Sequence, residues 1–277
     1  MTLSTRNRLL FSGFLASMVA LLMAIFASYQ TFGSLSTIVT KASGRASSMF
    51  SLTLPNWIPA SPYAAIGAVL LGVIFSLATV VILYYSFENT HAPEILFFAF
   101  FALSFLVESF RTLVPLSILN DWPPAVIVGT ARAISFSRFF GLLSFFAASV
   151  YATGVDFQKH SRVLVIIFVT SLTIASGIPV DGLAWDTSFT PISGYKTMFD
   201  LVEFGIAVLS ILGFLVAGRT RGTDQFPVAA IGGALVFIGR DILLHTDSWI
   251  GFPIGASLLA GGSWLITAKI HRYYLWL

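Results

Sequence analysis

Long, continuous apolar segments alternate with short polar ones along the chain. A helix that crosses the hydrocarbon core of a bilayer needs about 20 predominantly apolar residues. A transmembrane β-barrel would instead show alternating strands of about ten residues. We therefore predict an all-α fold, a polytopic membrane helical bundle with eight transmembrane helices. They are expected at residues 9–27, 64–86, 93–116, 124–153, 163–180, 197–217, 226–245 and 250–267.

The predicted helices divide the chain into three parts. Residues 1–30 form an N-terminal transmembrane helix, residues 31–62 an outer-face connection, and residues 63–277 a seven-helix transmembrane bundle. We expect the first helix to remain as an uncleaved signal anchor, because its apolar core is longer than the roughly 7–15 residues of a signal peptide. Apolar residues between Met49 and Ile58 predict that the second half of the connection lies against the membrane surface.

Composition supports the membrane class. The chain is 57% hydrophobic and only 10% charged, whereas soluble domains carry about 25% charged residues. The absence of cysteine excludes disulfides, thiolate metal sites and cysteine nucleophiles. The net charge of +3 is scattered, unlike the clustered basic surface of a nucleic-acid-binding protein. We expect the lipid bilayer, and no nucleic acid, as a partner.

The loops carry an asymmetric distribution of Lys and Arg. Cytoplasmic loops of membrane proteins are enriched in these residues. With a cytoplasmic N-terminus, eight of them fall inside and three outside, which predicts that both termini are cytoplasmic. The inner ones are Arg6, Arg8, Lys159, Arg162, Arg219, Arg221, Lys269 and Arg272, and the outer ones are Lys41, Arg45 and Lys196.

Several charged residues lie inside the predicted spans. A charge at membrane depth is costly, so it faces a bundle interior or a wet cavity and is paired there. A rise of about 1.5 Å per residue places them from the outer surface to the midplane, with Arg138 near or just past the middle. Four Arg and four acids balance formally, as a buried compensating network requires. These candidate ligand-binding residues are Glu108, Arg111, Arg132, Arg138, Asp200, Glu203, Arg240 and Asp241.

The counted depths also suggest contacts. Glu108 and Arg138 differ by only about 3 Å in depth on antiparallel neighbours, which predicts a direct or water-bridged pair. Arg132, Ser135 and Arg138 are expected on one broad stripe, each three residues from the next. Arg111 and Arg132 lie at nearly equal depth, and two facing guanidinium groups need a negative partner. Glu203 and Asp241 from other helices could supply it, and so could an anionic small molecule or a lipid head group.

Three interpretations of these charges remain open. They could be a structural ion-pair network that fixes helix register, or a polar pocket open to the outer face. In the third interpretation Asp200, Asp241 and His245 simply lie in the headgroup region, where charge is inexpensive.

No cofactor or catalytic motif emerges. Only His245 among the four histidines lies within a predicted span, so a bis-His haem is not predicted. Lys269 lies at the cytoplasmic end of the last span, where it can snorkel to the headgroups, rather than at a depth suited to a retinal Schiff base. The Glu-x-x-Arg at Glu108 lacks the further Glu and His of a metalloprotease. We expect no cofactor, no metal and no enzymatic activity.

Small residues recur in the last two spans. Small faces let helix backbones approach closely, and we expect them to serve packing within one chain rather than dimerisation. The glycines concerned are Gly232, Gly233, Gly239, Gly251, Gly255, Gly261 and Gly262.

The aromatic-rich segments at residues 84–87, 97–105 and 138–151 resemble the seven-helix sensor regions of bacterial signalling receptors. The resemblance covers about residues 62–270 and implies a bacterial inner membrane protein. In that family the helices usually precede a cytoplasmic output domain. Here only a few residues follow the last predicted span, so we expect output to pass to a separate protein partner.

We therefore predict a bacterial integral membrane sensor or small-ligand-binding protein with a charged pocket in the outer half of the bundle. One alternative is a non-catalytic subunit of a larger membrane complex, with the charges as structural ion pairs. Another is a transporter or proton-conducting protein, which would favour a polar path to both faces. The cytoplasmic halves of the spans hold almost no charge. An enzyme acting on lipid ranks last.

Overall fold

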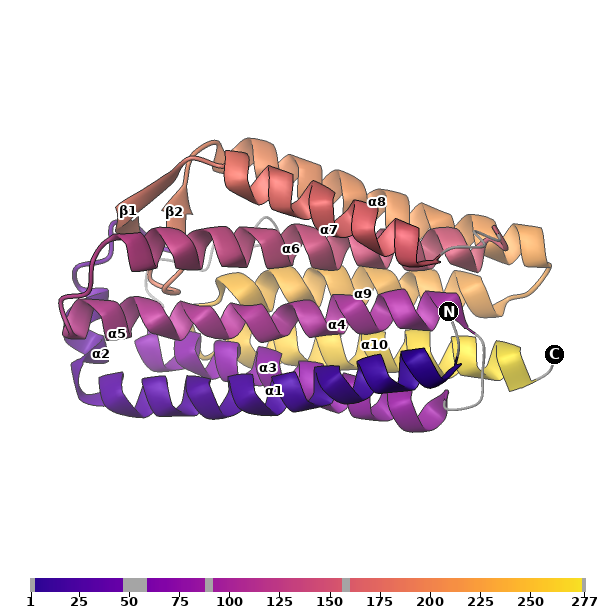
Figure 1. Ribbon diagram of the computed structural model, residues 1–277, viewed down its shortest axis with the longest axis horizontal. Helices are drawn as coiled ribbons and strands as arrows, with labels where there is room; N and C mark the ends of the chain where they lie inside the picture. The colour runs from indigo at the N-terminus through magenta and orange to yellow at the C-terminus, as the bar shows by residue number, and fades with distance from the viewer. Residues whose placement is uncertain (1–2, 47–58, 88–91, 156–159, 276–277) are drawn as a thin grey trace.

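The protein is a bundle of long helices that run along one common direction (Figure 1). The computed structural model describes residues 3–46, 59–87, 92–155 and 160–275. In these residues, eight helices are long and apolar enough to cross a membrane, which confirms the predicted all-α polytopic bundle. The long helices are α1 (Leu3–Thr31), α3 (Pro62–Ser86), α4 (Pro93–Val107), α6 (Ala125–Ala152), α7 (His160–Gly177), α8 (Lys196–Arg221), α9 (Gln225–His245) and α10 (Gly251–Leu275). The shorter ones are η1 (Phe32–Ser34), α2 (Leu35–Val39), η2 (Glu108–Thr112) and α5 (Leu113–Leu119).

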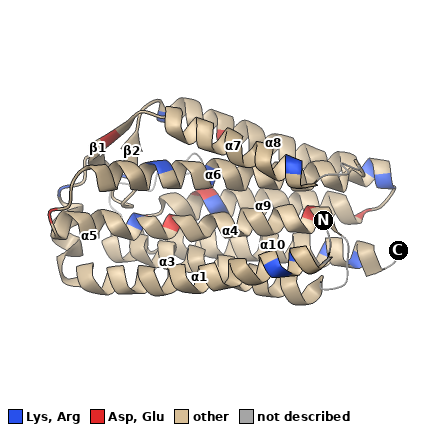
Figure 2. Ribbon diagram, viewed as in Figure 1, with Lys and Arg blue, Asp and Glu red and all other residues tan. Residues whose placement is uncertain are grey.

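The two ends of the bundle differ. Both chain termini lie at one end, which we call the terminal end (Figure 1). At the other end, the hairpin end, strands β1 (Val180–Trp185) and β2 (Pro191–Ser193) pair antiparallel between α7 and α8. Charged residues within the bundle lie in the half nearer the hairpin, and further charges gather at the terminal end (Figure 2).

The third span is interrupted by a tighter turn. α4 passes into the 3-10 segment η2 at Glu108 and resumes as α5 at Leu113. Pro115 explains the change, because its ring clashes with the carbonyl four residues earlier and it has no N–H to donate to that carbonyl, which belongs to Arg111. The predicted single helix at 93–116 is therefore three consecutive pieces, and the charged residues of this span lie in the middle one.

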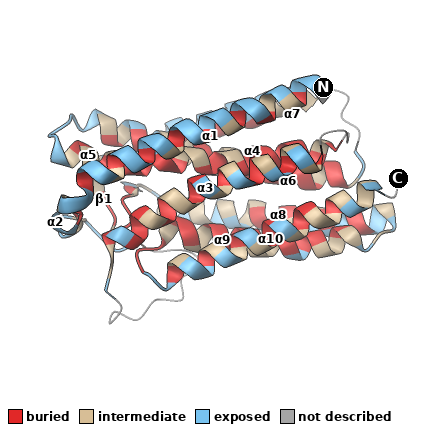
Figure 3. Cartoon of the chain, turned by 90° about the horizontal axis from the view of Figure 1, so that it is seen from below, coloured by how far each residue is buried: buried red, intermediate tan, exposed pale blue. Residues whose placement is uncertain are grey.

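The predicted glycine packing is present between α9 and α10. A Cβ on Gly239 would lie 2.5 Å from the Leu259 nitrogen, and one on Gly262 would lie 2.6 Å from the Gly232 oxygen. These distances leave no room for a side chain, so the two backbones touch. Along the bundle, exposed residues occupy the outward faces of the helices and buried residues the inward faces (Figure 3).

Aromatic rings fill the interior toward the terminal end. Phe101 on α4 and Phe145 on α6 are fully buried and lie edge to face at 5.1 Å between ring centroids. Phe237 on α9 lies 4.8 Å from Phe145 in the same arrangement. Such edge-to-face pairs add stability beyond the area they bury, and they join three helices in a dry core.

The hairpin end is closed by contacts between distant segments. The Ser43 N–H donates to the Trp185 carbonyl at 2.9 Å, and the Thr187 N–H donates to the Gly44 carbonyl at 3.1 Å. Asp247, after α9, accepts from Arg45 Nε at 3.0 Å. The first part of the predicted connection is thus helical through α2 and then pairs with the hairpin. The predicted membrane-surface segment from Met49 to Ile58 lies outside the described residues.

Candidate functional site

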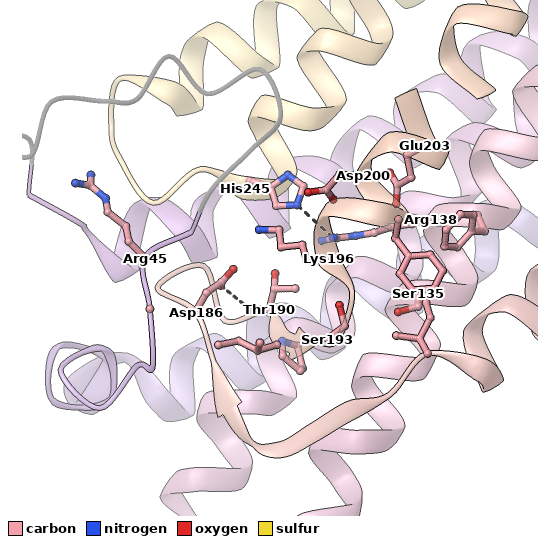
Figure 4. Close-up of a pocket in the computed structure, with 16 residues that line it drawn as sticks. Arg45, Ser135, Arg138, Asp186, Thr190, Ser193, Lys196, Asp200, Glu203 and His245 are labelled. Atoms are coloured by element: carbon pink, nitrogen blue, oxygen red, sulfur yellow. Dashed lines mark hydrogen bonds between the residues drawn. The ribbon is translucent and has the colours of Figure 1, made fainter. Parts of the chain in front are cut away.

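A cavity of about 230 Å³ opens beneath the hairpin, between α6, α8 and the end of α9 (Figure 4). Three basic and three acidic side chains line it, together with His245 and several hydroxyl groups. A smaller space of about 30 Å³ shares residues with it and reaches α9. The charged groups lining the larger cavity are Arg45, Arg138, Lys196, Asp186, Asp200 and Glu203.

The base of the cavity rests on the predicted pair between Glu108 and Arg138. Arg138 Nε donates to Glu108 Oε1 at 2.9 Å, which confirms the prediction. Glu108 is almost fully buried, and Arg111 Nη1 lies 3.7 Å from its other oxygen. A buried carboxylate between two guanidinium groups is well compensated, so Glu108 needs no ligand, and Arg111 donates its remaining hydrogen bonds to backbone carbonyls.

A second pair joins α9 to α8. Arg240 Nη1 donates to Glu203 Oε2 at 3.0 Å, and Arg240 Nη2 donates to the Arg138 carbonyl at 3.4 Å. Arg240 is buried, whereas Glu203 is part exposed toward the cavity. The two pairs together bind α6, α8, α9 and η2 to one another.

His245 connects this network to the cavity wall. Its Nε2 lies 3.3 Å from Arg138 Nη1, a contact visible in Figure 4. Because a guanidinium group can only donate, Nε2 is the acceptor and the ring proton resides on Nδ1. Nδ1 then donates to Asp241, whose carbonyl lies at 3.0 Å and whose carboxylate lies at 3.3 Å. This geometry fits a neutral imidazole.

Asp200 differs from the other acids of the site. It lines both the larger cavity and the smaller space, and its side chain points into the same region as Lys196 and His245 (Figure 4). Among the described residues, none forms a hydrogen bond or an ion pair with its carboxylate. The charge of Lys196, one turn earlier on α8, attracts it through space. A carboxylate without a hydrogen-bond donor at the edge of the membrane interior is costly, so Asp200 is the acid of this site with the least direct support from the described residues.

The expectation that Arg111 and Arg132 face each other around an anionic group is wrong. Arg111 is fully buried, donates from Nη1 to the Leu244 carbonyl at 2.8 Å, and donates from Nε and Nη2 to the Ser188 carbonyl. Arg132 is exposed. The reason is helical geometry. Each residue turns the helix by about 100°, so Arg132 and Arg138, six residues apart, point in directions about 120° apart around the axis. Arg138 faces the bundle interior, and Arg132 therefore faces away from it. Arg111 holds the hairpin and α9 together, and no paired-guanidinium anion site forms.

Sequence reasoning did not identify Asp186 as a site residue. Asp186 Oδ1 accepts hydrogen bonds from Ser188 N at 2.9 Å, Ser188 Oγ at 2.7 Å and Thr190 N at 3.0 Å. These bonds fix the hairpin turn, in which Phe189 adopts a positive φ of 61°. The Asp-Thr-Ser run before Phe189 is a turn-forming pattern that could have revealed it.

A separate polar cluster, also missed, lies at the terminal end. Glu94, at the start of α4, is fully buried and accepts a hydrogen bond from the Tyr274 hydroxyl at 2.7 Å. Arg221 at the end of α8 donates to the Tyr273 hydroxyl at 3.0 Å and to the Tyr151 carbonyl at 3.2 Å. These contacts join the terminal ends of α4, α6, α8 and α10.

Comparison with known proteins finds a weak similarity to a bacterial protein. No protein-family model matches the chain. The chain is 22% identical over 241 residues to an uncharacterized protein of Treponema pallidum (strain Nichols), and this covers 69% of each chain. The function is therefore inferred from the cavity itself.

Proposed function

We propose that this integral membrane protein is a receptor for a small polar ligand in the bacterial inner membrane. The hairpin end is the outer face in this proposal, both termini are cytoplasmic, and the ligand enters the cavity beneath the hairpin. The observation that carries the proposal is the cavity of about 230 Å³ that Asp200 lines without a hydrogen bond from a described residue. Clefts with a few convergent polar groups are the usual form of small-molecule sites.

The buried pairs explain why binding is favoured over a purely structural network. Glu108 with Arg138 and Glu203 with Arg240 are already satisfied by protein groups. A structural network needs nothing beyond these pairs. A further carboxylate in an open cavity beside them destabilises the fold and does not help to fix the relative positions of the helices. A bound ligand would offset this destabilisation.

The interior of the terminal half favours a receptor over a transporter. Transporters bring their polar path to both membrane faces. Here buried aromatic rings from α4, α6 and α9, among them Phe101, Phe145 and Phe237, lie between the paired charges and the terminal end. In the described part of the chain, the cavity ends at the paired charges. The aromatic core below them leaves no polar path for a solute, so binding would be communicated to the terminal end by a change in helix packing.

The test is thermal melting of the protein in nanodiscs against a library of small polar metabolites. We expect at least one compound to raise the melting temperature by mass action. Ser135→Phe, which fills the cavity from α6, should remove this gain. Ser257→Phe, at an exposed position of α10, is the matched control and should keep it.

The opposite result identifies the structural alternative. If no compound stabilises the native protein and Ser135→Phe raises its melting temperature, the cavity is a packing defect. The protein would then be a non-catalytic subunit whose charges only hold the bundle together, and the receptor proposal fails.

A further inference from the structure

We infer that the ligand of the cavity is a small zwitterion, with an ammonium group held by Asp200 and a carboxylate held on the Lys196 side. The chemistry is that of a free amino acid. This inference rests on the proposed function and specifies its ligand class.

The negative side of the cavity calls for an ammonium group. Asp200 and Glu203 lie one turn apart on α8, and Asp241 faces the same small space from α9. Glu203 is paired with Arg240, and Asp241 lies against His245. Asp200 is attracted by Lys196 but accepts no hydrogen bond from a described residue, so its oxygens are the ones that a donor on the ligand can reach. The described residues hold no cluster of three or more potential ligands that suits a metal ion. An ammonium group, with three donors, fits both the charge and the number of acceptors.

The positive side lies one turn nearer the hairpin. Lys196 precedes Asp200 by four residues on α8, and both side chains line the cavity. Their backbone positions are about 6 Å apart along the helix axis. A charge-assisted hydrogen bond at each end takes about 2.8 Å, so one small molecule with opposite charges can bridge the two side chains. Arg138, whose Nη1 faces His245, forms the opposite wall.

The charge balance of the wall favours a ligand with no net charge. The three basic and three acidic side chains around the cavity cancel formally. A pure cation or anion would leave one uncompensated charge in a low-dielectric site, which is strongly unfavourable. A zwitterion adds none and places each of its charges beside an opposite one.

The volume limits the ligand to a small molecule. At about 230 Å³, the cavity is below the range of about 300–1,000 Å³ in which drug-sized ligands bind. A free amino acid suits this space, whereas a phospholipid head group with its glycerol and chains does not. A lipid would also have to enter from the side, past the ion pairs between α8 and α9.

The experiment compares matched ligands on the full-length protein in nanodiscs. The probes are the common L-amino acids, β-alanine and γ-aminobutyrate. Each probe is accompanied by the amine that lacks its carboxylate and by the carboxylic acid that lacks its amine. We expect at least one zwitterion to raise the melting temperature and to bind in calorimetry, while its two single-charge analogues bind at least tenfold more weakly.

Two variants locate the site. Asp200→Asn should weaken zwitterion binding at least tenfold and leave the protein folded, because among the described residues the carboxylate has no hydrogen-bond or ion-pair partner to lose. Lys196→Gln should weaken binding as well. Asp181→Asn is the matched control, since Asp181 is exposed on β1 and accepts only from the Leu183 N–H at 2.9 Å among the described contacts, and it should leave affinity unchanged.

Two results would overturn the inference while leaving the receptor proposal intact. One is stabilisation by amines or carboxylates alone that equals that of the zwitterion. The other is full zwitterion affinity in Asp200→Asn. Binding of no metabolite in the wider library would instead remove the receptor proposal itself, so the two failures are distinct.

Discussion

Arg138 and Glu108 form an ion pair across two antiparallel helices, with Arg138 Nε 2.9 Å from Glu108 Oε1. Arg138 also contacts His245 on α9 and lines the cavity, so one guanidinium group joins the buried pair to the candidate site. If the proposed ligand binds in the cavity, we expect it to influence the packing of α6 against η2 through this contact.

Removal of one member of this pair should be more harmful than removal of both. Glu108→Gln or Arg138→Gln should each lower the free energy of unfolding by about 3–5 kcal/mol, because each leaves a buried charge without its partner. The double variant should recover part of this loss. Equilibrium denaturation in mixed micelles measures the cycle, and strict additivity of the two single losses would exclude a direct interaction.

Arg111 should behave as a structural residue. Arg111→Gln leaves the carbonyls of Ser188 and Leu244 without donors and Glu108 with one cation fewer, so a loss of about 3–5 kcal/mol is expected. Arg132→Gln, an exposed control on α6, should change stability by less than about 0.5 kcal/mol. Melting temperatures measured with and without ligand check both points. A ligand-dependent defect in Arg111→Gln would instead place Arg111 in the binding site.

The contact between α9 and α10 should be sensitive to a single methyl group. Gly262→Ala places Cβ 2.6 Å from the Gly232 oxygen, and such overpacking costs about 1–3 kcal/mol. At Gly261, the neighbouring residue, nothing lies within 4 Å of the added Cβ. Gly261→Ala should therefore be neutral or stabilising, since alanine is favoured over glycine by about 1 kcal/mol in a helix. Equal melting temperatures for the two variants would contradict this packing.

The terminal-end cluster should depend on the Tyr274 hydroxyl. Tyr274→Phe removes the hydrogen bond to the buried Glu94 carboxylate and should cost about 1–3 kcal/mol. Tyr85→Phe is the control because Tyr85 is 74% exposed. Thermal melting of both variants is the measurement. If Tyr274→Phe has the same melting temperature as the native protein, another group must donate a hydrogen bond to Glu94.

Labelling can test which end of the bundle faces outward. The native chain has no cysteine, so a thiol reagent can label this protein only at an introduced cysteine. Leu183→Cys on β1, where Leu183 is 73% exposed, should react with an impermeant thiol reagent in intact cells. Thr220→Cys at the terminal end of α8 should react only after permeabilisation. The reverse pattern would invert the topology and place the cavity on the cytoplasmic side.

The sequence by itself determined the membrane class, the spans and one specific contact. The length and apolarity of each segment define a spanning helix, and the fixed rise per residue is enough to equate the depths of Glu108 and Arg138. The glycine pairs of the last two spans predicted the close approach of α9 and α10, because small residues have few other uses at such density.

The tertiary structure alone decided which charges face one another. The faces of Arg111 and Arg132 could not be read correctly from spacing. Pro115 turns the middle of its span into a 3-10 segment with a different period, and the stripe on α6 drifts round the helix. The carbonyl of Ser188 comes from a hairpin about 77 residues away along the chain. Whether a buried charge is satisfied depends on such distant partners, which is why only the fold shows Arg111 bound to the hairpin and Asp200 facing an open cavity.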